Sequence, residues 1–117
     1  MTLIDTSVWI DHFRLGSERL SEMLESGACQ THEVVIGELA CGTLPRREAT
    51  LLLLEQLPRI RSASAEEAMW LLRHARLHGR GLGWTDLLLL ASALAAETSL
   101  WTLDARLARA AHALGCA

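Results

Sequence analysis

The feature that most constrains the fold of this chain is a regular alternation of short apolar runs with longer amphipathic stretches. Four runs have the length and composition of strands: the run that ends before Asp5, and residues 28–31, 59–62 and 99–103. The stretches between them show helical periodicity. Strands that alternate with helices pair in parallel, so the sequence predicts an α/β fold with a short parallel sheet covered by helices.

Capping residues set the expected helix boundaries. Thr6 and Ser7 are expected to cap the first helix, because a side-chain oxygen can accept from an unpaired amide of the first turn. Ser64 and Glu67 have the spacing of a capping box at the start of a later helix. Pro45 suits the first turn of the helix that ends before Pro58.

Length and charge limit the class of protein. With 117 residues, half of them hydrophobic, the chain is expected to form one domain over residues 1–117 with a real core. The formal net charge of −3 does not suggest a nucleic-acid partner by itself. All eleven basic residues are Arg, a bias that we attribute to genomic composition.

Cysteine usage and hydropathy indicate a cytoplasmic location. Three cysteines form no C-x-x-C pair, which suits reduced thiols better than a disulfide framework. The start of the chain shows no basic segment followed by a long apolar one, so no signal peptide is expected. The longest apolar segment, residues 87–96, is shorter than the about 20 residues that a membrane span needs, and is expected to be a buried helix.

Acidic residues occupy comparable positions along the chain. Asp5 and Asp104 each follow a strand, and Asp86 opens a helix that is otherwise almost uncharged. Glu38 lies in a nearly apolar helix and is expected to be largely buried, where an acid needs a partner or a cation. Asp11 lies on the exposed part of the first helix and is assigned no role.

These acids are expected to meet at the carboxyl edge of the sheet, where open α/β folds bind ligands. If the first and fourth strands are neighbours, Asp5 and Asp104 lie roughly 5 Å apart. Two carboxylates at that distance repel by about 3 kcal/mol at an effective dielectric constant near 20. A divalent cation would balance them, and hard oxygen ligands favour Mg²⁺ or Mn²⁺ over zinc. For each acid alone, helix capping or a structural ion pair is the alternative.

Four motifs resemble those of PIN-domain ribonucleases, and most closely the VapC toxins of VapBC toxin-antitoxin pairs. The resemblance covers essentially the whole chain and consists of residues 4–11 (IDTSVWID), 37–39 (GEL), 84–93 (WTDLLLLASA) and 100–104 (LWTLD). It implies a small α/β/α sandwich with a central parallel sheet of four or five strands. The chain stops soon after Gly115, which leaves little room for the fifth strand.

The resemblance also implies a site and a reaction. Asp5, Glu38, Asp86 and Asp104 match the family's acidic cluster, which binds Mg²⁺ or Mn²⁺ and cleaves RNA phosphodiester bonds. We interpret Asp5, Asp86 and Asp104 as metal ligands and Glu38 as a ligand of a second ion or the group that orients the attacking water. The positions whose hydroxyls support that cluster correspond to Thr6, Ser7 and Thr102. The implied partners are a VapB-like antitoxin and a second copy of the chain.

Three further residues are candidates for contact with RNA. Arg14 and Arg80 suit backbone phosphates, although each is more often an ordinary surface Arg. Trp84 could stack on a base, but a packed core tryptophan is the favoured interpretation. The run Leu51–Leu54 makes its helix apolar on more than one side, so part of that helix is expected to face a partner.

Three other functions would suit parts of this pattern. A non-catalytic PIN-fold module that only binds a partner would keep this fold without nuclease activity. A phosphoacceptor domain of the response-regulator type is disfavoured, because the chain has no Lys to contact an acyl phosphate. A haloacid-dehalogenase-like phosphatase requires a second acid two residues after Asp5, where this chain has Ser7.

Overall fold

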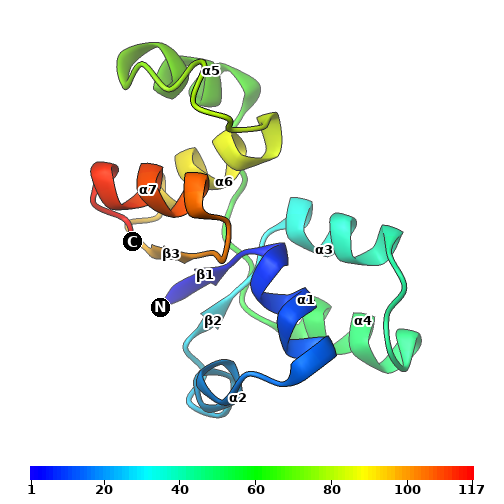
Figure 1. Ribbon diagram of the computed structural model, residues 1–117. Coiled ribbons are helices and arrows are strands. Elements are labelled where there is room, and N and C mark those ends of the chain that lie inside the picture. The colour runs from blue at the N-terminus through cyan, green and yellow to red at the C-terminus, as the bar shows by residue number, and fades with distance from the viewer.

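A parallel sheet lies at the centre of the structure, and seven helices surround it (Figure 1). This computed structural model describes residues 1–117. None of the seven helices is both long and apolar enough to span a lipid bilayer. The elements follow one another as β1 (Thr2–Ile4), α1 (Thr6–Leu15), α2 (Glu18–Glu25), β2 (Cys29–Gln30), α3 (Glu33–Cys41), α4 (Arg47–Gln56), α5 (Ala65–His74), α6 (Trp84–Ala95), β3 (Ser99–Trp101) and α7 (Ala105–Leu114).

The sheet has the order β2-β1-β3, with β1 in the middle and both neighbours parallel to it. Ile4 at the end of β1 is in register with Trp101 at the end of β3. The first and last predicted strands are therefore neighbours, as expected. Leu3 and Ile4 are fully buried, because helices cover both faces of this central strand.

The sheet has three strands, fewer than the four or five expected. Residues 59–62 contribute only one parallel bridge, between Thr31 and Arg59. The chain leaves the sheet at Ala63, whose amide donates to the Ser92 hydroxyl of α6 at 2.8 Å instead of to a strand. No fifth strand forms either: Cys116 makes a single backbone hydrogen bond to β3, from the Leu100 amide to its carbonyl at 2.6 Å.

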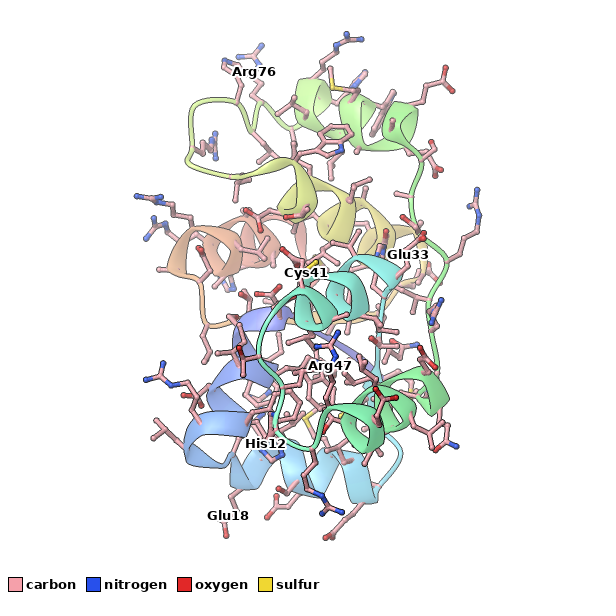
Figure 2. The ribbon with its side chains drawn as sticks, turned by 90° about the vertical axis from the view of Figure 1, so that its right-hand side faces the viewer. His12, Glu18, Glu33, Cys41, Arg47 and Arg76 are labelled. Atoms are coloured by element: carbon pink, nitrogen blue, oxygen red, sulfur yellow. The ribbon has the colours of Figure 1, made fainter.

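The α/β class agrees with the prediction, while some helix ends differ. The capping box of Ser64 and Glu67 at the start of α5 is present. Pro45 does not lie in the first turn of α4, which begins at Arg47 after Arg46 in a left-handed conformation with φ of 46°. Arg47 turns back and donates to the Ala40 carbonyl at 2.7 Å, which ties α4 to the end of α3 (Figure 2).

Helix packing separates two groups of elements. Figure 1 shows α6 and α7 next to β3, with α5 packed on α6 at the top of the view. Helices α1, α3 and α4 pack against one another on the other side of β1. The segment 87–96, expected to be a buried helix, forms most of α6, in which Leu89, Leu90 and Ala93 are at most 1% exposed. The carboxyl ends of β1 and β3 lie between these two groups of helices.

A buried network joins the two groups through His32. Its Nδ1 accepts from the Val34 amide at 3.0 Å, so the neutral ring carries its proton on Nε2, which lies 3.0 Å from the Ser92 hydroxyl. The Ser92 hydroxyl in turn donates to the Leu88 carbonyl at 2.6 Å and accepts from the Ala63 amide. Burial lowers the pKa of His32, and the positive charge of Arg59 adds to this against the opposing effect of Glu33.

We predict a pH-dependent contribution of His32 to stability. Its pKa is depressed in the folded state, so the unfolded chain binds the proton more readily and the free energy of unfolding falls as the pH drops below the ordinary value of 6.5. Urea unfolding of the wild type and of His32→Gln at pH 7.5 and pH 5.5 checks this. His32→Gln should remove part of the pH dependence of the free energy of unfolding. A His32→Gln variant that keeps the full pH dependence of the wild-type free energy of unfolding would contradict the prediction.

Candidate active site at the carboxyl end of the sheet

Asp5 lies where β1 ends and α1 begins, and it is 7% exposed. Its Oδ2 accepts hydrogen bonds from the Ser7 and Thr102 hydroxyls, both at 2.7 Å. Asp5 occupies the position before α1 but caps no amide of that helix. The alternative that it serves as a helix cap is therefore wrong, and so is the expectation that Thr6 and Ser7 cap α1, because their hydroxyls contact carboxylates instead.

The two hydroxyls on Asp5 are themselves held by backbone amides. The Leu103 amide donates to Ser7 Oγ at 2.9 Å, and the Asp104 amide donates to Thr102 Oγ1 at 3.0 Å. A hydroxyl has one proton to donate, and each of these hydroxyls gives it to Asp5. The 3.2 Å approach between Ser7 and Thr102 is therefore a contact of two acceptor oxygens. Four groups, one from α1 and three from the segment after β3, thus orient one carboxylate.

Glu38 lies beside this arrangement. Its Oε1 accepts from the Thr6 hydroxyl at 2.8 Å, which links α3 to the start of α1. The expectation that Glu38 is buried is wrong, because it projects from the exposed side of α3 together with Gly37, whereas Val35 and Leu39 face the core. The helix is apolar along its sequence, but only one side of it is covered.

Asp104 follows β3 and caps α7. Its Oδ1 accepts from the amides of Arg106 at 2.9 Å and Leu107 at 3.1 Å. The register that pairs Ile4 with Trp101 puts Thr102, not Asp104, across from Asp5. Asp104 lies two residues further on than Thr102, at the start of the helix.

Asp86 lies in the first turn of α6, and its Oδ2 accepts from the Gly83 amide at 2.8 Å. Burial raises the pKa of this carboxyl, and the charges of Asp5 and Asp104 raise it further, whereas the Gly83 bond opposes both. Asp5 and Asp104 are thus near enough to Asp86 for their charges to act on it. Segments at the two ends of the sequence thus contribute to one acidic region.

The four acids share a pattern of bonding. Each has one carboxylate oxygen held by the protein, and its second oxygen has no hydrogen-bond partner in the protein. None of them has a basic partner, since the structure has a single ion pair, between Arg61 and Glu67 at 3.8 Å. The free Oδ1 of Asp5 is not enclosed, because only Trp9 and Thr31 have fully buried side-chain polar atoms without a partner.

The donor set fits a hard divalent cation, although the site is not a closed cage. Free carboxylate oxygens and uncompensated negative charge are what Mg²⁺ and Mn²⁺ prefer. No three acidic, histidine or cysteine side chains already lie close enough together to enclose an ion. A cation here would therefore draw the carboxylates together and relieve the repulsion on Asp86.

The candidates for RNA contact are all at the surface. Arg14 and Arg80 are exposed. Trp84 is 44% exposed, so its interpretation as a packed core residue is wrong; it begins α6 at the rim of the acidic region, and its neighbour Leu87 enters the core instead. Sequence reasoning did not single out Arg106 and Arg109, although their helical spacing directly after Asp104 is a signal that would have found them.

We predict that Asp86→Asn stabilises the metal-free protein. The carboxyl pKa is raised above its ordinary value of 3.8, so the folded state loses stability as the pH rises through this region and Asp86 ionises beside Asp5 and Asp104. Asn keeps an oxygen that can accept from Gly83. Thermal unfolding in EDTA at pH 7 should show a higher Tm for Asp86→Asn than for the wild type. The half-buried Asp11 is the control, and Asp11→Asn should change the Tm little; a lower Tm for Asp86→Asn would refute the repulsion.

Comparison with known proteins gives the family. The PIN domain family model matches residues 2–113. Ribonuclease VapC32 of Mycobacterium tuberculosis, found in strains CDC 1551 / Oshkosh and ATCC 25618 / H37Rv, is 42% identical over 118 residues, which cover all of this chain and 95% of that protein. The resemblance seen in the four motifs is thus confirmed over the full length. The chain belongs to the PIN-domain family and is a VapC-like member of it.

Proposed function

We propose that this protein is a VapC-like toxin that hydrolyses RNA phosphodiester bonds with Mg²⁺ or Mn²⁺ and is neutralised by a cognate antitoxin. The observation that carries the proposal is the group of four acids, Asp5, Glu38, Asp86 and Asp104, each with one oxygen anchored and one free. Membership of the PIN-domain family and the full-length similarity to a protein named as a ribonuclease support it. No observation favours the non-catalytic alternative.

Asp5, Asp86 and Asp104 would hold the cation. When bound, such an ion lowers the pKa of a water molecule and stabilises the charge of the phosphoryl transition state. The hydroxyls of Ser7 and Thr102 fix Asp5 and leave its Oδ1 directed away from their bonds. They act as positioning residues, because the orientation of ligands by surrounding hydrogen bonds sets how well those ligands bind.

Glu38 has a different role in this proposal. It is exposed and held at Oε1 by Thr6, so its free Oε2 is available to accept a proton from an attacking water. The water oxygen forms a bond to phosphorus as the bond to the ribose 3′ oxygen breaks, and the leaving oxygen takes up a proton. The products are a 5′-phosphate and a 3′-hydroxyl.

The partners belong to the same proposal. Exposed leucines on α4, Leu52 at 57% and Leu53 at 46%, agree with the expectation that part of this helix faces a partner. Ile10 on α1 is 45% exposed and adds to the apolar surface. We assign such surface to the antitoxin or to a second copy of the chain in a homodimer. The free cysteines and the RNA substrate fit a cytoplasmic location.

We predict that Asp5→Asn and Asp104→Asn each lower metal-dependent RNA cleavage by more than about 100-fold, since the loss of groups that merely orient metal ligands already costs about 10- to 100-fold. Cleavage of a labelled single-stranded RNA with Mn²⁺ measures this. Asp11→Asn should cleave at the wild-type rate. Circular dichroism checks that every variant is folded.

Metal binding is tested separately from cleavage. Mn²⁺ at about 100 times its Kd should stabilise the wild type by about 2.7 kcal/mol, because it binds only the folded state. Asp5→Asn should lose most of this stabilisation. Cleavage by folded Asp5→Asn at the wild-type rate would refute the assigned site. Binding of Mn²⁺ by a wild type that cleaves no RNA would favour the non-catalytic alternative.

A further inference from the structure

Three arginines line a small cleft between α7 and the glycine-rich loop of residues 80–83 (RGLG), which precedes α6. The cleft has a volume of about 290 Å³ and is lined by Arg80, Leu82, Arg106, Arg109 and Ala110. Arg106 and Arg109 lie one helical turn apart on α7, so their side chains project to the same side. Arg80 comes from the loop and faces the same cleft.

None of these guanidinium groups has an acidic partner. The structure has a single ion pair, between Arg61 and Glu67, and all three cleft arginines are exposed. Three arginines without acidic partners give this cleft a local positive charge, although the net charge of the whole chain is −3. Guanidinium groups bind phosphate oxygens in a bidentate manner, which suits such a cleft to a phosphate ligand.

The loop is shaped to accommodate Arg106. Gly81 has φ of +77°, and a Cβ placed on it would lie 2.6 Å from Arg106 Cδ and 2.9 Å from its Nε. The positive φ favours glycine at this position, and the absence of a Cβ lets the flexible Arg106 side chain lie close over the loop. The arrangement is a close contact between two segments rather than a chance gathering of free surface side chains.

The cleft and the acidic region are built on the same two segments. The Arg106 amide donates to Asp104 Oδ1, and Gly83 at the end of the loop donates to Asp86 Oδ2. Trp84 follows directly and is 44% exposed. If the scissile phosphate of an RNA strand lies among the acids, the cleft can take a neighbouring phosphate, and the exposed ring of Trp84 can stack on a base.

We propose that the Arg80, Arg106 and Arg109 cleft binds backbone phosphates of the RNA strand next to the cleaved bond. The inference rests on the proposed ribonuclease function. A polyanion with evenly spaced charges matches three separate cations better than a single protein carboxylate does. The cleft would thus supply the attraction for RNA that the acidic region, with its uncompensated negative charge, cannot.

The test measures RNA binding without cleavage. Asp5→Asn in EDTA serves as the background, and a fluorescently labelled single-stranded RNA is the probe. Replacing Arg80, Arg106 and Arg109 together by Ala should weaken binding at least tenfold at 0.1 M salt. The slope of log affinity against log salt should fall by about 2, since each phosphate contact on a single strand contributes about 0.7. Replacement of all three by Lys should keep the salt slope, because the charges remain, and should lower the affinity less than the Ala variant does.

Arg73→Ala is the matched control, because this exposed arginine lies on α5 and lines a different cleft. It should leave the affinity and the salt slope unchanged. Thermal unfolding checks that the triple variant is folded. Unchanged RNA affinity in the folded triple variant overturns the inference, as does loss of antitoxin binding with RNA binding intact. Failure of the proposed function would instead appear as absence of cleavage by the wild type with Mn²⁺.

Discussion

The structure depends on the pair of hydrogen bonds that hold the carboxylate of Asp5. Ser7 belongs to α1 and Thr102 to the segment after β3, so one buried acid joins elements that are 95 residues apart in the sequence. The amides of Leu103 and Asp104 fix the same hydroxyls and thereby set where α7 begins. A charged group with so little exposure requires this many hydrogen bonds, and its position determines the geometry of the whole acidic region.

The surface around the carboxyl end of the sheet has a negatively charged part and a positively charged part. The acids at its centre repel one another, which raises the pKa of Asp86 in addition to the effect of burial. The arginines of the neighbouring cleft are too far away to form ion pairs with them. This separation keeps the free carboxylate oxygens available to a cation, and it leaves the guanidinium groups available to an anion. A fold that paired these charges with one another would be more neutral but would bind neither ligand well.

Much of the fold could be predicted from local signals. The alternation of strands and helices, the capping box at Ser64 and the apolar run of α6 each depend on neighbouring residues, and all three are present. The strand at 59–62 was wrong because the segment makes one bridge and then leaves the sheet at Ala63, whose amide donates to Ser92, far along the chain. Glu38 was expected to be buried because its helix is apolar along the sequence. It is exposed, because apolar composition does not reveal which sides of a helix the rest of the protein covers.

The sequence by itself determined the α/β class and the family, and it predicted which acids form the site, since these depend on residue type and spacing along the chain. Only the tertiary structure decided how those acids are held: Thr102 lies across from Asp5, and Thr6 contacts Glu38. It also decided that Arg106 and Arg109 share a cleft with Arg80. Strand register and helix packing make these contacts, and both arise from burial of the apolar core as a whole. The spacing of residues in one segment carries no information about the segment that will lie beside it.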